Sequence, residues 1–157
     1  MAMAVTLKLT PATADDFAYL YDLCEATMRR YVEIDLGDRF EQIARPTLQK
    51  LLQRDLFSKI HVNDVLVGAM AFELHDTHIQ LEEIYVEAAS QNQGVGTVVV
   101  RQLIEQSTSL GLPIRLHVLA SNGARYFYEK LGFSITRSTK EVNFMEYRPR
   151  DGVPSAD

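Results

Sequence analysis

Apolar residues recur at steps of three and four along the first third of the chain, a pattern that predicts two amphipathic helices. In the first segment they run from Phe17 to Tyr31 and share one face of a helix. In the second, Asp38 and Glu41 have the spacing of a capping box, which predicts a helix start. Pro46 interrupts this second segment. Because proline is poorly tolerated beyond a first turn, we expect a kink or a new helix there.

From Ser58 onward the pattern changes to short extended segments separated by polar turns. Three of them, at 59–62, 65–74 and 77–86, predict an antiparallel meander, and a short strand at 6–9 precedes the first helix. Later segments alternate between the two types: a helix that ends at Gly111, a strand at 114–119, a helix at 122–131, and strands near 133–137 and 142–147.

The order of these elements predicts an α/β protein with one mixed central sheet of about six to seven strands and helices on both faces. The strand–helix–strand unit in the second half of the chain should have parallel strands joined by a right-handed crossover. Residues 1–147 are therefore expected to form a single domain, followed by a polar tail at 148–157 that we expect to be disordered.

Composition adds limits on the class of protein. The chain has 157 residues, of which 46% are hydrophobic and 24% charged, and its net charge is −5 at pH 7. With the single Cys24 and no set of cysteines and histidines at zinc-site spacing, neither a disulfide nor a metal is expected. The acidic balance, without a block of Lys or Arg, argues against nucleic acid as a partner. Neither a signal peptide nor a membrane span is evident, so we expect a cytoplasmic protein.

A glycine-containing loop, QNQGVG from Gln91 to Gly96, lies between a predicted strand and a predicted helix. Gly94 and Gly96 leave the backbone open to a ligand, and the first amides of the following helix lie at the positive end of its dipole. Such a loop suits a phosphate group, although strand–glycine–helix turns also occur for structural reasons alone. The glycine spacing fits neither a Walker A loop nor a dinucleotide fingerprint, which favours a pyrophosphate bound without a catalytic metal.

A second motif, ASNGARYFYEKLGF, runs from Ala120 to Phe133. Together with the QNQGVG loop one helix and one strand earlier, it resembles the GNAT superfamily of N-acetyltransferases in both order and spacing. The resemblance is strong from Leu81 to Phe133 and looser in the elements that precede it. The loop departs from the family pattern at Asn92 and Gln93, which leaves amides rather than charge to hold the phosphates.

The resemblance implies the GNAT fold and acetyl-CoA as co-substrate. The pantetheine arm would pair with the backbone of Ile84 and Val86, and the pyrophosphate would rest on amides from Gln91 to Thr97. Asn122 would cap the last helix and could also reach the cofactor arm, or it would serve only as a cap. The residues assigned to cofactor binding on this basis are Ile84, Tyr85, Val86, Gln91, Asn92, Gln93, Gly94, Val95, Gly96, Thr97 and Asn122.

The resemblance also puts Tyr128 near the thioester sulfur, where its hydroxyl could protonate the leaving thiolate; core packing is the alternative role. An alkylamine with a pKa near ~10.4 is mostly charged at pH 7, so some group must accept its proton. Glu82 and Glu83 are neighbours on a predicted strand, so only one of them can face the cleft. Alternation places Glu83 on the face of Leu81 and Tyr85.

His117, on the following strand, is a third candidate for the base because its intrinsic pKa suits proton transfer. We expect the proton to pass through water to one of the three groups, and we take Tyr128, Glu83 and His117 as the catalytic candidates. No cysteine is expected near this site, which favours direct attack in a ternary complex over a covalent acetyl-enzyme; Cys24, far away in the sequence, is the one thiol that could still approach it.

These observations predict an acetyl-CoA-dependent N-acetyltransferase that acts on a small-molecule amine or a peptide amine, as a monomer or a homodimer. The alternative is a CoA-binding module that senses acyl-CoA without turnover, and the presence of Tyr128 favours the enzyme. Tyr31, Glu33 and Asp35 near the end of the first helix could attract a cationic acceptor, or they could form a solvated helix end.

Overall fold

The computed structural model describes residues 6–150, which form one mixed sheet of seven strands flanked by four α-helices. The strands are β1 (Leu7–Pro11), β2 (Phe57–Val62), β3 (Val65–Leu74), β4 (Ile79–Val86), β5 (Ile114–Leu119), β6 (Ser134–Ser138) and β7 (Val142–Tyr147). The helices are α1 (Phe17–Leu36), α2 (Phe40–Gln53), α3 (Val95–Leu110) and α4 (Ala124–Lys130). The predicted fold class and the predicted order of elements are confirmed.

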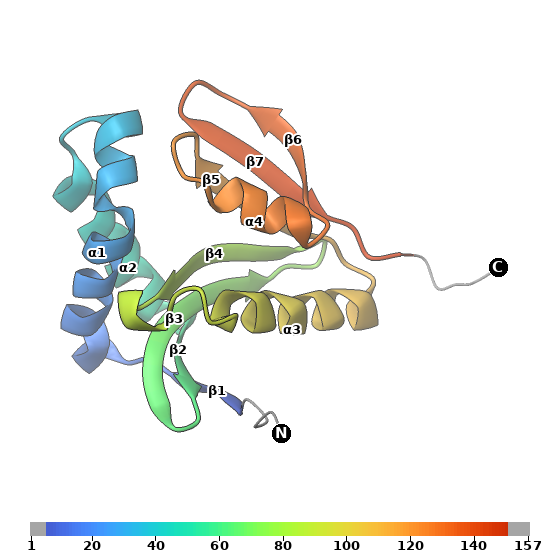
Figure 1. Ribbon diagram of the computed structural model, residues 1–157, viewed down its shortest axis with the longest axis horizontal. Coiled ribbons are helices and arrows are strands. Elements are labelled where there is room, and N and C mark those ends of the chain that lie inside the picture. Colours follow the sequence, from blue (N-terminus) through green and yellow to red (C-terminus); the bar gives the residue numbers. More distant parts are fainter. Residues whose placement is uncertain (1–5, 151–157) are drawn as a thin grey trace.

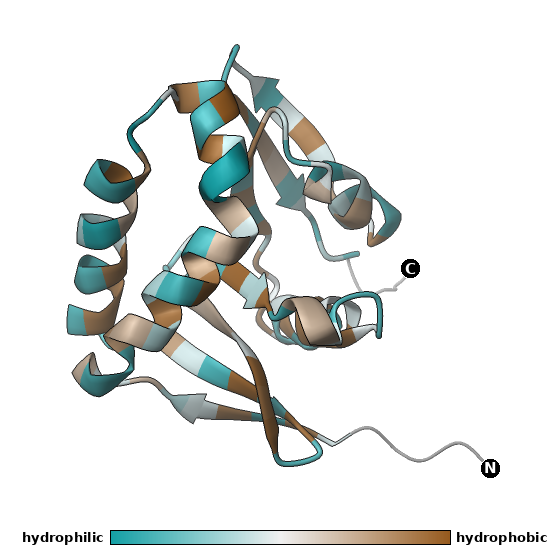
Figure 2. Cartoon of the chain, turned by 60° about the vertical axis from the view of Figure 1, so that its left-hand side comes forward, coloured by the Kyte–Doolittle hydropathy of each residue, from teal (hydrophilic) through white to brown (hydrophobic). Residues whose placement is uncertain are grey.

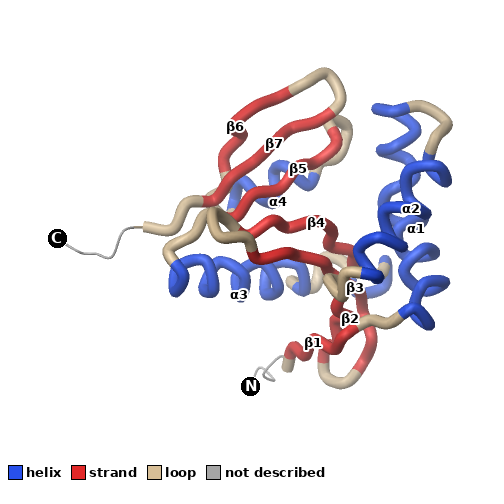
Figure 3. Tube along the Cα trace, turned by 180° about the vertical axis from the view of Figure 1, so that it is seen from behind, coloured by secondary structure: helices blue, strands red, loops and turns tan. Residues whose placement is uncertain are grey.

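The helices cover the two faces of the sheet, and each face has its own buried core (Figure 3). On one face α1 and α2 pack over a core that includes Leu20, Leu48 and Phe57. On the other face α3 and α4 pack over a core that includes Val99 and Met145. Hydrophilic and hydrophobic residues alternate along α1 and α2 (Figure 2), as expected for helices with one buried side.

The strands of the sheet follow the order β1-β2-β3-β4-β5-β7-β6, and all neighbours are antiparallel except β4 and β5. The parallel pair is short, because only Ile79 pairs with Ile114 and Gln80 with Arg115. Beyond these residues the two strands diverge toward α1 (Figure 1). One edge of β4 therefore faces an opening in the sheet rather than a neighbouring strand.

A one-residue bulge in β4 changes which residues share a face. Ala71 of β3 pairs with Glu83 and Phe72 pairs with Leu81, so Glu82 is the extra residue. Leu81 is consequently part of the core under α3 and α4, whereas Tyr85 is part of the core under α1 and α2. The prediction that Leu81 and Tyr85 lie on the same face is wrong, because simple alternation does not hold across a bulge.

The capping box predicted at Asp38 and Glu41 is absent: Arg39 is the N-cap of α2 and makes no side-chain cap hydrogen bond. A capping box occurs instead ahead of α1, in a short 3₁₀ turn. There the backbone amide of Thr13 donates to Asp16 Oδ2 over 2.8 Å. Both sites satisfy the sequence spacing, so spacing alone does not identify the residue that starts the helix.

Of the two outcomes predicted at Pro46, a kink or a new helix, the new helix is not observed, since α2 continues from Phe40 to Gln53. Pro46 lies on the exposed side of the helix, where water can hydrate the Gln42 carbonyl that loses its helical partner. Ala44 and Leu48 are buried in the core on the opposite side. Packing of these residues outweighs the lost hydrogen bond.

The structure describes the predicted C-terminal tail only as far as Arg150, so the remainder of that tail, 151–157, lies outside the described residues. None of the helices within residues 6–150 has the length and apolar character needed to span a bilayer.

Candidate functional site

A cavity of about 340 Å³ lies where β4 and β5 diverge. α1 and α2 line one side of it, and residues of β4, β5 and α4 line the other. The cavity brings together all four residues considered for proton transfer: Glu82, Glu83, His117 and Tyr128. They come from three elements, β4, β5 and α4, that meet only because the parallel strands separate after two residue pairs.

Glu83 is the most strongly perturbed acid of this cavity. Its Oε1 accepts a hydrogen bond of 2.7 Å from the hydroxyl of Tyr85. Burial raises the pKa of the Glu83 carboxyl from its usual value of 4.5 to about 7, against the opposing effect of the Tyr85 hydrogen bond. The charge of Glu82 adds a smaller upward contribution to this pKa. Near neutral pH, Glu83 can therefore both accept and release a proton.

Cys24 of α1 also lines the cavity, close to the hydroxyl of Tyr85. The prediction that no cysteine lies near the site is thus wrong, because α1 packs against β4 although 60 residues of sequence separate the two side chains. Burial raises the pKa of the Cys24 thiol to about 12. The thiol stays protonated at neutral pH, which makes it a poor nucleophile.

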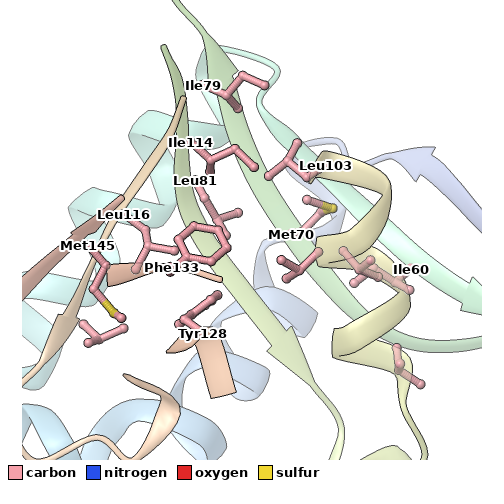
Figure 4. Close-up of a cluster of buried hydrophobic side chains, with 14 of the residues drawn as sticks. Ile60, Met70, Ile79, Leu81, Leu103, Ile114, Leu116, Tyr128, Phe133 and Met145 are labelled. Atoms are coloured by element: carbon pink, nitrogen blue, oxygen red, sulfur yellow. The ribbon is translucent and has the colours of Figure 1, made fainter. Parts of the chain in front are cut away.

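Tyr128, on α4, is only 5% exposed. Its ring packs edge-on against Phe127 and Phe133, with centroid distances of 5.0 and 5.3 Å. Figure 4 shows it at the margin of the core, near Phe133 and Leu116. Burial, and then the negative charge of Glu83, raise the pKa of the Tyr128 hydroxyl. This residue serves core packing and also presents a protonated hydroxyl group to the cavity.

His117, on β5, is exposed and lines the cavity. Its ring lies 6.0 Å from that of Phe144, its partner on β7. The open environment contrasts with that of Glu83, which lies on the other side of the split between β4 and β5.

The QNQGVG loop joins β4 to α3, and its side chains fold back onto the loop. Gln91 donates from Nε2 to the Val86 carbonyl over 2.9 Å, and Gln93 donates to the Ala89 carbonyl over 3.2 Å. Gly94 caps α3 with a φ of +82°, in the left-handed region that glycine adopts readily. The backbone amides at the start of α3, which have no partner within the helix, are donors that this loop can offer to a ligand, together with the Asn92 side chain.

Two residues of this region that the sequence assigns to cofactor binding also have a structural role. A Cβ at Gly96 would lie 3.4 Å from the ring of Phe127, so Gly96 also permits α3 and α4 to pack. The Val86 carbonyl, assigned to the pantetheine arm, already accepts the hydrogen bond from Gln91. Asn122 accepts a 2.9 Å hydrogen bond from the Ala124 amide, but the N-cap of α4 is Gly123, so Asn122 lies one residue ahead of the cap position predicted for it.

The end of α1 is connected to the loop that follows β5. Asp35 Oδ2 accepts hydrogen bonds from the Ser121 amide at 2.9 Å and from the Ser121 hydroxyl at 2.7 Å. Glu33 pairs with Arg29, and the Tyr31 hydroxyl accepts from Arg30. Sequence analysis did not identify Ser121, because no local pattern links residues 86 positions apart.

The part of the chain that the structure describes contains no evident metal site. No group of three or more His, Cys, Asp or Glu side chains there is arranged to hold a metal ion. What the cavity offers instead is a carboxyl group with a pKa near neutrality and a protonated phenol at the opening of the sheet.

Comparisons with known proteins bear on the family and the fold of this chain. The model of the acetyltransferase (GNAT) family matches residues 18–133. No curated protein sequence matches the chain, but many solved structures share its fold.

Three of these structures show the extent of the likeness. The PaiA N-acetyltransferase from Thermoplasma acidophilum, solved with coenzyme A, has 16% sequence identity and a TM-score of 0.71, covering 93% of this chain and 99% of its own. The protein PH1933 from Pyrococcus horikoshii OT3 has 20% identity and a TM-score of 0.73, covering 94% and 99%. The ribosomal-protein-S18-alanine N-acetyltransferase from Escherichia coli has 18% identity and a TM-score of 0.61, covering 97% and 100%.

Proposed function

The chain belongs to the GNAT family of acetyltransferases, and on that premise we propose that it transfers the acetyl group of acetyl-CoA to a primary amine by direct attack in a ternary complex. The observation that carries the proposal is the pair formed by Glu83 and Tyr128. One is a half-buried carboxyl whose pKa is raised to about 7, the other a buried phenol with a raised pKa, and both line the same cavity.

The residues at the opening of the sheet fit the proposed donor. Acetyl-CoA would supply a thioester that an amine can attack. The free edge of β4 from Leu81 to Val86 and the amides at the start of α3, from Gly94 to Thr97, are the groups we assign to hold it. The coenzyme A in the T. acidophilum structure supports acetyl-CoA as the donor.

Proton transfer follows from the two side chains. A neutral amine nitrogen forms a bond to the acetyl carbon while the carbon–sulfur bond breaks, and the surplus amine proton passes to the Glu83 carboxylate, directly or through water. The Tyr128 hydroxyl gives its proton to the departing thiolate. Glu83 then restores that proton through water, so that the products are an amide and a thiol.

Glu83 is preferred over the other two bases because burial raises the pKa of its carboxyl to about 7 and the Tyr85 hydroxyl holds the carboxylate in place. His117 and Glu82 line the same cavity and remain the alternatives that variants must test. The high pKa of Cys24 supports direct attack over an acetyl-enzyme.

We assign this activity to a single domain spanning residues 1–147, located in the cytoplasm and acting as a monomer or a homodimer. The acceptor is a small-molecule or peptide amine; the E. coli neighbour is by its name an alanine N-acetyltransferase of a ribosomal protein.

The decisive experiment measures thiol release from acetyl-CoA in the presence of a panel of amines, together with acetyl-CoA binding by thermal shift. Thiol release that depends on an amine supports the acetyltransferase. Binding of acetyl-CoA without thiol release for any amine would instead identify a module that senses acyl-CoA. Absence of binding contradicts both functions.

A further inference from the structure

The cavity is markedly asymmetric in the chemistry of its walls. Its α1 and α2 side is apolar and consists largely of Met28, Val32, Leu36, Phe40, Ile43 and Leu48. The carboxylates that line it, Glu82 and Glu83, are both on β4. A molecule that fills this space therefore meets a proton acceptor at one end and hydrocarbon at the other.

Charged groups of α1 and α2 that lie near the cavity are engaged elsewhere. Arg29 stacks over the ring of Phe40 at 4.8 Å and pairs with Glu25 and Glu33. Arg45 lies over the ring of Tyr21 at 5.0 Å. No lysine or arginine occurs among the described residues that line the cavity. Apart from the exposed His117, the walls accordingly offer no side chain that can balance a carboxylate on the acceptor.

Polar side chains in the walls are also largely committed. Thr47 donates from its hydroxyl to the Ile43 carbonyl over 2.7 Å, and Asn122 accepts from the Ala124 amide. Asp35, the acid at the end of α1, is held by Ser121. Few partners remain for the amide groups of a peptide backbone, which must be hydrogen-bonded when they are buried.

From these features we propose that the acceptor is a small monoamine with an apolar body, its nitrogen directed to Glu83 and its hydrocarbon part packed against α1 and α2. This inference rests on the proposed acetyltransferase function and narrows its substrate class. The cavity has a volume of about 340 Å³, at the lower end of the range of about 300–1,000 Å³ that is typical of small-molecule pockets. The reacting end of acetyl-CoA must share this volume, because the β4 edge assigned to it lines the same cavity, and the acceptor must therefore be small.

Two other classes of amine fit the walls poorly. A diamine would bury its second ammonium group among the hydrocarbon side chains of α1 and α2. An amino acid with its nitrogen at Glu83 would place its carboxylate beside Glu82 and Glu83, with no lysine or arginine in the walls to pair with it. Desolvating an unpaired charge costs far more than the ~1.4 kcal/mol that corresponds to a factor of ten in binding. Discrimination of at least about tenfold against both classes is therefore expected.

Matched pairs of amines test the inference on the unaltered protein. Thiol release from acetyl-CoA is measured with hexylamine against 1,6-diaminohexane, and with 2-phenylethylamine against phenylalanine. The inference expects kcat/KM at least about tenfold higher for the first member of each pair. Equal or higher values for the diamine, the amino acid or a peptide N-terminus overturn the inference while the acetyltransferase function stands. If no amine supports thiol release, the function itself fails.

A charge placed in the apolar wall supplies a second test. Met28 is half-buried, lines the cavity, and lies one helical turn beyond Cys24 on the same face of α1. M28E should raise the kcat/KM ratio of 1,6-diaminohexane to hexylamine by about tenfold or more, because the new carboxylate can pair with the second ammonium group. M28Q, which is polar and uncharged, is the matched control.

Circular dichroism and melting curves establish that both Met28 variants are folded before their ratios are compared. An unchanged ratio in folded M28E, or an equal change in M28Q, contradicts the assignment of this wall to the acceptor. The comparison of amine pairs in the parent protein decides the inference if M28E does not fold.

Discussion

Tyr85 donates its hydroxyl hydrogen to the carboxylate of Glu83, two positions earlier on the same strand, over 2.7 Å. The contact joins a residue of the buried core under α1 and α2 to the most perturbed acid of the cavity. Because the bond favours the ionised carboxylate, Tyr85 limits how far burial can raise the pKa of Glu83. The remaining pKa, about 7, is where a general base is most effective at neutral pH.

Glu83→Gln should lower kcat/KM with the best acceptor by about 10²–10⁴-fold, the usual contribution of general acid–base catalysis. In the parent protein kcat/KM should rise with pH through about 7, since Glu83 must lose its proton to act as the base. This limb of the pH profile should be absent in the variant. His117→Ala and Glu82→Gln are the controls: if either removes the limb and Glu83→Gln does not, the base is assigned to the wrong residue.

Tyr85→Phe should move that same limb to higher pH. The substitution removes the hydrogen bond that stabilises ionised Glu83 while leaving the ring in the core, so the carboxyl pKa rises further. A structural role alone would lower the rate without displacing the profile. The measurement is the pH dependence of kcat/KM, and a midpoint unchanged from the parent would contradict a positioning role for Tyr85.

The titration of Glu83 should also make the free energy of unfolding depend on pH. Its pKa is about 7 in the folded protein against a usual 4.5, so between these values the native state binds more protons than the unfolded state. The free energy of unfolding should consequently fall, by an amount on the order of 3 kcal/mol, as the pH rises from below 4.5 to above 7.

Urea denaturation at pH 5 and pH 8 provides the measurement, with Glu83→Gln as the reference chain that lacks this titration. The stability of the parent relative to Glu83→Gln should decrease between the two pH values. If the difference between the two proteins is the same at both, the carboxyl is not buried as described.

Tyr128→Phe should reduce kcat while leaving acetyl-CoA binding intact. The change removes one hydroxyl and little volume, so the packing against Phe127 and Phe133 persists. A loss of about 10²-fold or more is expected for a general acid. A loss below about tenfold, with thermal stability preserved, would confine Tyr128 to its role in the core.

Gly94→Val should abolish the stabilisation that acetyl-CoA confers. Ligand at a hundredfold excess over its dissociation constant adds about 2.7 kcal/mol to the stability of the parent. Valine at a φ of +82° distorts the loop whose amides we assign to the pyrophosphate. Gly111→Val is the matched control, since Gly111 has a φ of +68° but caps the other end of α3. Both variants should melt lower, and only Gly111→Val should retain the shift on adding acetyl-CoA.

Much of the fold could be predicted because its signals are local. The three- and four-residue spacing along α1 and the glycine that ends α3 at Gly111 determine those helices within the segments themselves. The bulge at Glu82 has no such signal, because a run of alternating strand residues reads the same with or without an extra residue.

The cavity was harder to predict from the sequence than the helices, because it is formed by contacts between segments that are distant along the chain. Cys24, Tyr85 and Glu83 meet only when α1 packs on β4. The sequence did narrow the base to three candidates. Choosing among them requires knowing how deeply each side chain is buried, which is a property of the assembled fold. The same applies to Asp35 and Ser121, whose contact crosses the opening of the sheet.

The bulge in β4 also determines where this strand tolerates a change of length. Glu82 is the extra residue, so deleting it would leave a regular ladder in which Glu83 and Tyr85 keep their faces. Deleting Ile84 instead would turn either Tyr85 and Val86, or Glu83 and the residues before it, to the opposite face of the sheet. Glu83 and Tyr85 would then no longer share a face. Among related chains, a one-residue gap at position 82 is thus compatible with the same cavity, whereas a gap two positions later is not.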